Sequence, residues 1–281
     1  MKRVASGLVV LLLLSLIIAA GCRRAARTDK NVETEPLARL EAEMDSLLGD
    51  LDRDLSGAAH ELAARGIKGD SARRVLERLS AKHPFVLDCC SFDSTGSLVQ
   101  SAPRGHHRLP DEGVQIPNRE SLAEMRRTGQ PSLGRLFRFL DGTTGVDMNQ
   151  PILSSEGEFL GTVGFVIEAD ELMANLRRRA FPEGKVDAWA AEASSGSIIG
   201  GGVLREPGEQ GAGGAKQDSG WIAFVEALAA SPSGSGSYEF FEPDSGRLVR
   251  KQVSWSTIRV HRRDWRIGVT MAETQGEGTQ Q

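Results

Sequence analysis

The stretch FVLDCCSFDSTGSLVQS, from Phe85 to Ser101, decides the fold. Phe85 to Phe92 is strand-like, Asp93-Ser94-Thr95-Gly96 has the composition of a turn, and Ser97 to Gln100 returns as a second strand. The pattern predicts a β-hairpin. A shorter echo, Ser195-Gly196-Ser197-Ile198-Ile199, follows 100 residues after Thr95-Gly96-Ser97-Leu98-Val99. The echo indicates that the chain carries the same unit twice.

The two halves also agree in the order of the elements around each hairpin. Each hairpin is followed by a loop, a short helix and three strands. We expect the helices at 119–128 and 221–230, a helix linking the halves at 169–181, and strands near 133–140, 146–153, 159–167, 236–242, 248–260 and 265–271. This order predicts an α+β fold with two tandem modules, each an antiparallel sheet with helices on one face.

A long amphipathic helix is expected before the first hairpin. Apolar residues recur at steps of three and four, with acidic and basic residues between them: Leu37, Leu40, Met44, Leu47, Leu48, Leu51, Leu55, Ala58, Ala59 and Leu62. Such a stripe needs a partner surface. The spacing leaves two partners open, the sheets of the same chain or a second copy in a dimer, and a departure from the strict heptad after Leu51 weighs against a free coiled coil.

The N-terminus predicts export and lipid anchoring. Lys2-Arg3 precedes an uncharged stretch from Val4 to Ala20, which ends in Ala19-Ala20-Gly21-Cys22. A positive head, an apolar run and small residues before cysteine are typical of a lipoprotein signal peptide, so Cys22 is the expected lipidation site. An uncleaved anchor is the alternative, since about 17 apolar residues is the short limit for a membrane span. Either way the remaining chain lies outside the cytoplasm, and the absence of Asp after Cys22 favours the outer membrane.

Composition argues against several classes of function. The net charge is −4 and 26% of the residues are charged, so the chain has no positive field that would hold nucleic acid. His106-His107 lacks the spacing of a zinc site, 211–216 misses the phosphate-loop pattern, and Gly234-Ser235-Gly236-Ser237 is a turn into a strand, not a nucleophile elbow. We therefore expect neither an enzyme nor a metal or cofactor.

The remaining cysteines and the tryptophans are expected to be structural. Cys89 and Cys90 are adjacent in a strand, so their side chains point to opposite faces and a bridge between them would be strained. Two buried thiols are the expected state, with a redox switch as the alternative. Trp189, Trp255 and Trp265 fall in predicted strands and are expected in the core.

In its order of elements the chain resembles the double Cache sensor domains, PAS-like extracytoplasmic modules of bacterial chemoreceptors and sensor kinases. The resemblance rests on the long helix, the segment 85–101, Pro151-Ile152 leading to 157–165, and the closing Asp264-Trp265-Arg266-Ile267-Gly268-Val269. It covers residues 35–271. It implies the following segments: signal peptide 1–21, tether 22–34, N-terminal helices 35–82, membrane-distal module 83–168, linking helix 169–185, membrane-proximal module 186–271 and polar tail 272–281.

The resemblance also implies where a ligand would bind. In this family the membrane-distal module holds a small ligand over its sheet, and amino-acid-binding members clamp the ligand carboxylate with Tyr, Arg and Trp and the amine with Asp. This chain departs from that set, because its only tyrosine is Tyr238 and no tryptophan precedes Trp189. The candidate ligand-binding residues are Arg126, Arg135, Arg138, Asp147 and Glu168. Arginine suits an anionic ligand because its planar fork matches a carboxylate. Solvent-exposed faces are the alternative for these side chains.

Together these observations predict a lipid-anchored sensing or small-ligand-binding module. Its ligand would be a small anionic or amino-acid-like molecule, and it would report to a separate sensor kinase, receptor or transporter, because nothing after Cys22 is long and apolar enough to cross a membrane. The alternative is a structural or adaptor envelope lipoprotein with no small-molecule ligand. That alternative would leave the helix stripe from Leu37 to Leu62 exposed for pairing.

Overall fold

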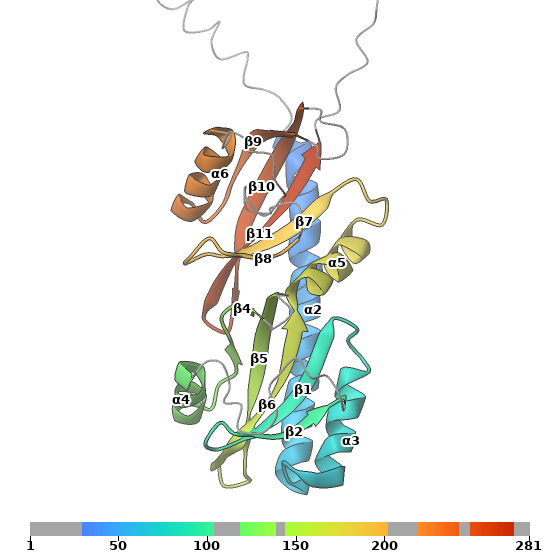
Figure 1. Cartoon of the computed structure of the whole chain (residues 1–281), viewed down its shortest axis with the longest axis vertical. Coiled ribbons are helices and arrows are strands. Elements are labelled where there is room, and N and C mark those ends of the chain that lie inside the picture. The colour runs from blue at the N-terminus through green and yellow to red at the C-terminus, as the bar shows by residue number, and fades with distance from the viewer. Residues whose placement is uncertain (1–29, 104–118, 139–143, 202–218, 242–247, 273–281) are drawn as a thin grey trace, which may run out of the picture. The chain divides into compact units, whose positions relative to one another are not determined.

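The fold of the chain was taken from a computed structural model that describes residues 30–103, 119–138, 144–201, 219–241 and 248–272. From Pro36 onward these residues belong to one compact unit, whose two sheets appear in Figure 1. The elements are α2 (Lys30–Arg65), α3 (Gly69–Ser80), β1 (Val86–Asp93), β2 (Leu98–Ala102), α4 (Arg119–Thr128), β3 (Ser132–Leu133), β4 (Phe137–Arg138), β5 (Thr144–Leu153), β6 (Phe159–Glu168), α5 (Ala169–Ala180), β7 (Asp187–Glu192), β8 (Ile198–Gly200), α6 (Ser219–Ala230), β9 (Gly234–Phe241), β10 (Leu248–Val260) and β11 (Arg263–Ala272).

Two antiparallel sheets confirm the predicted tandem modules. The first module runs from β1 to β6 and has the strand order β2-β1-β6-β5-β3, with β4 also paired to β5. The second module runs from β7 to β11 and has the order β8-β7-β11-β10-β9. The two hairpin turns also match, since Asp93 and Glu192 each donate a main-chain hydrogen bond to the carbonyl of a serine, Ser97 and Ser197. Gly96 and Gly196 take the positive φ of these turns.

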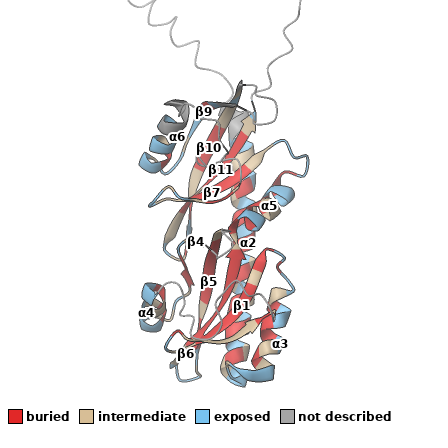
Figure 2. Ribbon diagram, viewed as in Figure 1, coloured by how far each residue is buried: buried red, intermediate tan, exposed pale blue. Residues whose placement is uncertain are grey.

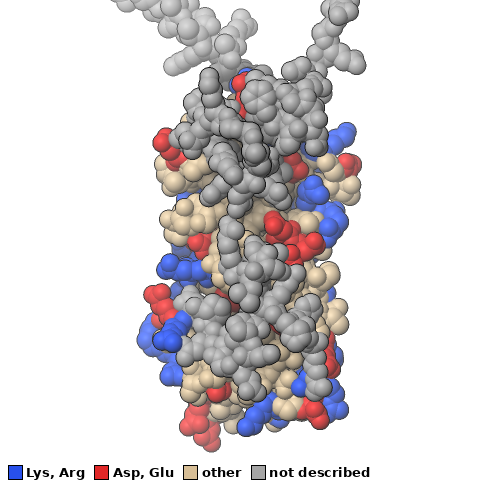
Figure 3. All heavy atoms as spheres, viewed as in Figure 1, with Lys and Arg blue, Asp and Glu red and all other residues tan. Residues whose placement is uncertain are grey.

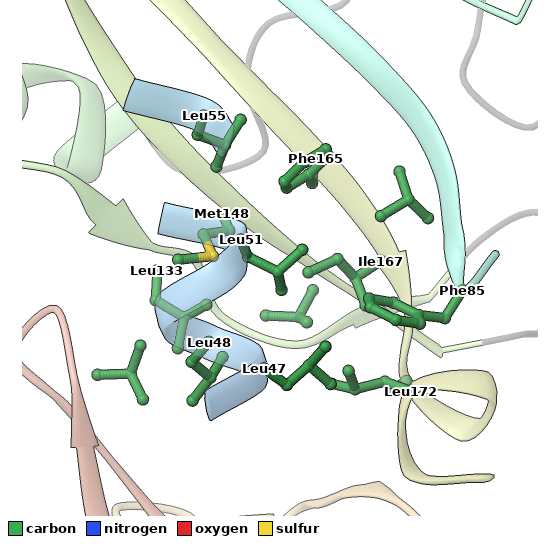
Figure 4. Close-up of a cluster of buried hydrophobic side chains, with 14 of the residues drawn as sticks. Leu47, Leu48, Leu51, Leu55, Phe85, Leu133, Met148, Phe165, Ile167 and Leu172 are labelled. Carbon is green, nitrogen blue, oxygen red and sulfur yellow. The ribbon is translucent and has the colours of Figure 1, made fainter. Parts of the chain in front are cut away.

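The apolar stripe of α2 packs on the chain's own sheets. Leu40, Met44, Leu51, Leu55 and Leu62 are fully buried, and they share one core cluster with residues of α3, α5 and both sheets. Figure 4 shows this cluster around α2, and the ribbon in Figure 2 is coloured as buried along one part of the helix and along the central strands. The predicted stripe is therefore confirmed, and of the two partners left open the structure has the sheets of the same chain. The adaptor alternative expected this stripe to be exposed for pairing, and that expectation is wrong.

Helices cover both faces of each sheet, so the expectation of helices on one face is wrong. On one face of the first module, Cys89, Phe165 and Met148 meet the leucines of α2. On the other face, Cys90 and Phe92 meet Leu122 of α4. Because neighbouring residues of a strand point to opposite faces, both faces of β1 are apolar enough to take a helix. In the second module α6 packs on the face opposite α2.

Two further details differ from the sequence expectations. Helix α2 begins at Lys30, inside the predicted tether 22–34, because polar residues there have adequate helix propensity without an apolar period that would reveal it. The strand expected at 133–140 is two short strands, since Leu136 donates its main-chain N–H to the Glu192 carboxylate, at 3.4 Å, instead of to β5. His106-His107 and 211–216 lie outside the described residues.

The thiols and tryptophans lie as expected. Cys89 and Cys90 are free, buried and on opposite faces of β1, and burial raises the pKa of both. Trp189, Trp255 and Trp265 are buried in the second module. These residues are therefore structural.

Candidate functional site

The α4 side of the first sheet carries a row of polar side chains across its three longest strands, β1, β6 and β5, which lie side by side in Figure 1. Asp88 of β1 is paired with Val166 of β6, and Val166 with Asp147 of β5. Directly paired residues share a face, and so do residues two apart on one strand. Asp88, Asp147, Asn149 and Thr162 therefore lie on one face, which we call the polar face.

The polar face is buried, and its hydrogen bonding is incomplete. Asp88 and Asp147 are each 4% exposed, Asn149 is 2% exposed and Thr162 is fully buried. The Asn149 amide donates to the Asp147 carboxylate, Nδ2 to Oδ2, at 2.5 Å. The second oxygen of Asp147, one oxygen of Asp88 and the Thr162 hydroxyl have no hydrogen-bond partner in the described structure. Buried polar atoms are nearly always paired, so these unpaired atoms make the polar face the candidate site.

Burial also changes the acidity of both carboxylates. It raises the pKa of Asp88 from its ordinary 3.8 to about 7, with no partner to offset the effect. Burial raises the pKa of Asp147 to about 6, and the hydrogen bond from Asn149 and the positive charge of Arg263 limit the rise. A nearby cation would lower both values, so the polar face favours a positively charged group.

Two glycines make room for these side chains. A Cβ built on Gly134 would lie 1.7 Å from Oδ1 of Asp147, and one built on Gly164 would lie 2.1 Å from Oδ1 of Asn149. Neither position could carry a larger residue without displacing the polar face. The close approach of the sheet backbone to Asp147 and Asn149 therefore depends on glycine at these two positions.

In the second module, aromatic side chains fill the face that corresponds to the polar face. Cys90 lies three residues before Asp93, the acidic residue at the start of its hairpin turn, and Trp189 lies three residues before Glu192. Each of the two is paired with a glycine of the central strand of its sheet. The first module has Cys90, Gly164 and Asn149 in that row, and the second has Trp189, Gly268 and Trp255.

The two tryptophans pack against a common set of side chains. Phe224 of α6 lies with its ring 5.8 Å from each tryptophan ring, and Tyr238 stacks on Phe224 at 5.7 Å. The Trp189 indole donates to the Thr270 hydroxyl at 3.1 Å. Asp187, which corresponds to Asp88, pairs with Lys251 at 3.4 Å and with Arg177 at 3.5 Å. Trp189 and Asp187 therefore find their polar partners within the described chain.

The candidate site residues from the sequence do not all meet on the polar face. Asp147 is central to it, and it is buried instead of exposed. Arg126 is exposed on α4 with its guanidinium over the Phe159 ring at 5.5 Å, and Arg135 is exposed between β3 and β4. Arg138 lies in β4 with its side chain outside the described residues. Glu168 is half-buried at the end of β6, where its main-chain N–H bonds the Phe85 carbonyl.

Sequence reasoning missed Asp88, Asn149 and Thr162. Each is a polar residue inside a strand that is otherwise apolar, and that was the available signal. One strand alone could not show that the three share a face, because register is set by pairing between strands. The lipidation site Cys22 lies outside the described residues.

Metal binding and membrane crossing were also assessed for the described part of the chain. No group of three or more His, Cys, Asp or Glu side chains is placed there to hold a metal ion. None of the helices in these ranges has the length and apolar character needed to cross a bilayer. On the face drawn in Figure 3, the visible acidic and basic side chains are interspersed, so no large field of one sign is present there.

Tandem PAS-like sheets along one N-terminal helix give the described chain the fold of double Cache domains. Residues 46–169 match the family model described as HK/GC/Chemotaxis protein-like, sensor domain. No curated protein matches the chain in sequence.

Solved structures of this class share the fold. An extracellular ligand-binding receptor from Desulfohalobium retbaense DSM5692 matches with a TM-score of 0.66 and 23% identity over 87% of this chain, which spans 41% of that receptor chain. The ligand-binding domain of the Pseudomonas aeruginosa PAO1 amino acid chemoreceptor PctB, in complex with L-Gln, has a TM-score of 0.53 and 15% identity over 88% of this chain and 90% of its own. The corresponding domain of Campylobacter jejuni Tlp3, in complex with L-valine, gives 0.57 and 9% over 86% and 91%.

Proposed function

We propose that this protein is a lipid-anchored extracytoplasmic sensing module, which binds a small ligand on the polar face of its first module and reports binding to a separate membrane protein. The observation that carries the proposal is the contrast between the two modules. The second module fills its α6 side with Trp189 and Trp255, whereas the first leaves oxygens of Asp88 and Asp147 without partners. Leaving a buried oxygen unpaired costs about 1–3 kcal/mol, and a ligand that supplies donors recovers that cost.

The comparisons support a small polar ligand. The family match covers the first module, which contains the polar face, and two structural neighbours are complexes with L-Gln and L-valine. An amino-acid-like ligand would place its ammonium group against Asp147. Arg126, Arg135, Arg138 and Glu168 stay candidates at the edge of such a site, because side-chain rotamers around a binding site commonly change when the ligand binds.

The membrane attachment and the partner are part of the same proposal. Lipid on Cys22 would hold the module at the envelope surface. The residue that follows the cysteine is not Asp, which favours the outer membrane. A module attached in this way needs a second protein to carry its signal, and a sensor kinase ectodomain, a receptor or a transporter would serve. The adaptor without a ligand keeps less support, because the helix stripe it would use is buried.

The test is a thermal-shift screen of the purified full chain in detergent, against amino acids, organic acids, amines, sugars and purines. A ligand at 100 times its Kd adds about 2.7 kcal/mol of stability and should raise the Tm by roughly 5 to 10 °C. Asp147→Asn should abolish the shift. Asp187→Asn, at the position in the second module that corresponds to Asp88, is the control and should leave the shift unchanged. The absence of a shift with every compound would contradict ligand sensing and favour the adaptor.

A further inference from the structure

The polar face holds two carboxylates on either side of one apolar residue. Asp88 and Asp147 are each paired with Val166, from opposite sides, so one strand separates them. Neighbouring strands are about 4.8 Å apart, which puts the Cα atoms of the two aspartates about 10 Å apart. Val166, 6% exposed, forms the floor between them.

Each carboxylate keeps one oxygen unpaired. Asn149 satisfies only Oδ2 of Asp147, and Asp88 has an unpartnered Oδ1 in the described structure. Thr162, which is two positions further along the face from Gly164, adds an unpartnered hydroxyl. A ligand with a single ammonium group would pair with one carboxyl group and leave the other buried without a partner, which is costly.

Apolar side chains lie further along the same side of the sheet. Cys90, Phe92 and Leu122 of α4 form a cluster on this side of the sheet. Arg126 and Arg135 are exposed, and Arg263 uses its Nε to bond the Leu133 carbonyl at 3.1 Å. A ligand carboxylate over Val166 would face two carboxylates of the same charge, which is unfavourable. A single metal ion is also a poor fit, since calcium takes six to eight oxygen ligands and the described residues hold no group of three acids for one.

We infer that the ligand of this site is a short aliphatic diamine, with one ammonium group on Asp88, the other on Asp147 and its methylene chain over Val166. This inference rests on the proposed function, because it names the ligand class for the same face. The two charges match the two carboxylates, and the apolar spacer matches the valine between them.

The test is isothermal titration calorimetry of the full chain in detergent with three probes that share a four-carbon chain. Putrescine carries two ammonium groups, butylamine carries one, and 4-aminobutyrate carries one ammonium group and one carboxylate. Putrescine should bind at least about tenfold more tightly than either of the others, because a hydrogen bond between charged groups contributes about 1.5–3 kcal/mol. Equal or tighter binding of butylamine or 4-aminobutyrate would overturn the inference.

Two substitutions locate the site. Asp88→Asn keeps the size of the side chain and should weaken putrescine at least about tenfold while leaving butylamine nearly unchanged. Asp187→Asn should leave both affinities unchanged, because Asp187 pairs with Lys251 and Arg177. Unchanged putrescine affinity in Asp88→Asn would contradict the assignment, provided that circular dichroism shows a folded variant.

The screen described above separates this inference from the proposed function. If an amino acid or an organic acid raises the Tm and putrescine does not, the protein is a sensor and the diamine assignment is wrong. If no compound raises the Tm, the sensing function itself is wrong.

Discussion

Arg263 of β11 donates a hydrogen bond from Nε to the main-chain carbonyl of Leu133 in β3, at 3.1 Å, and so joins the second module to the first. The turn before it carries two residues with positive φ, His261 and Arg262, a backbone conformation that non-glycine residues rarely adopt. His261 lies 2.7 Å from the Asp52 carboxylate of α2, and Arg262 pairs with Glu124 of α4. The tip of the β10–β11 hairpin is thereby fixed to elements beside the polar face.

Arg263→Ala should lower stability and change the titration of Asp147. The Leu133 carbonyl loses its donor, which costs about 1–2 kcal/mol. The pKa of Asp147 should rise, because the charge of Arg263 lowers it in the native protein. Urea unfolding measures the first effect and an NMR titration of the side-chain carboxyl measures the second. Arg259→Ala is the control: that side chain is 74% exposed in its pair with Asp264, and its loss should have a much smaller effect on stability. Equal losses in the two variants would contradict a structural role for the contact.

The stability of the unliganded protein should fall as the pH rises from about 4 to about 7. The pKa of Asp88 is raised to about 7 and that of Asp147 to about 6, so the folded state binds more protons than the unfolded chain in this range. The groups that share the face are Cys90, Asn149 and Thr162, with Arg263 as the neighbouring cation. Asp88→Asn should make this loss of stability with rising pH smaller.

At pH 8 the Asp88→Asn variant should be more stable than the native protein, by at most about 4 kcal/mol, and at pH 4 the two should be equal. Urea unfolding at both pH values measures this. Asp264→Asn should have the opposite effect. The hydrogen bond from Arg259 lowers the pKa of Asp264, so the ionised carboxylate stabilises the folded protein at pH values above the pKa that Asp264 has in the unfolded chain. A native protein that gains stability from pH 4 to 7 while Asp88→Asn does not would refute the buried, unpaired state of Asp88.

Gly164→Ala should damage the polar face. The new Cβ would lie 2.1 Å from Oδ1 of Asn149, and the side chain would have to move. We expect a loss of about 1–3 kcal/mol, as is usual for overpacking, together with loss of ligand-induced stabilisation. Gly236→Ala is the control, since its Cβ would meet nothing within 4 Å. Thermal unfolding of the two variants, side by side, decides the matter, and a stable Gly164→Ala would show that Asn149 is free to rearrange.

Leu51→Ala should destabilise the monomer without changing its oligomeric state. Leu51 is fully buried by the chain's own sheets, and truncation of such a leucine costs about 2–5 kcal/mol. Leu153→Ala, at a 36% exposed position, should be close to neutral. Guanidinium unfolding measures the loss, and sedimentation velocity reports the oligomeric state. A dimer that dissociates in Leu51→Ala would revive the pairing function of the helix stripe.

The order of elements and the apolar stripe of α2 could be predicted from the sequence. The apolar residues of the helix stripe recur at steps of three and four, and the two hairpins share Gly96 and Gly196 at equivalent turn positions, so local periodicity and turn chemistry are enough. The bounds of short or polar elements could not be predicted as well. The start of α2 at Lys30 and the break between β3 and β4 depend on helix propensity and on single hydrogen bonds, which leave no period in the sequence.

The candidate site was only partly predictable, and the reason is physical. The sequence by itself determined that Asp147 is a polar residue in an apolar strand and that Cys22 follows an apolar run that ends in small residues. Only the tertiary structure decided that Asp88 and Asp147 flank Val166 on a buried face, while Trp189 and Trp255 fill the corresponding face of the second module. Strand register and the pairing of distant strands set those neighbours, and neither is encoded within a single strand.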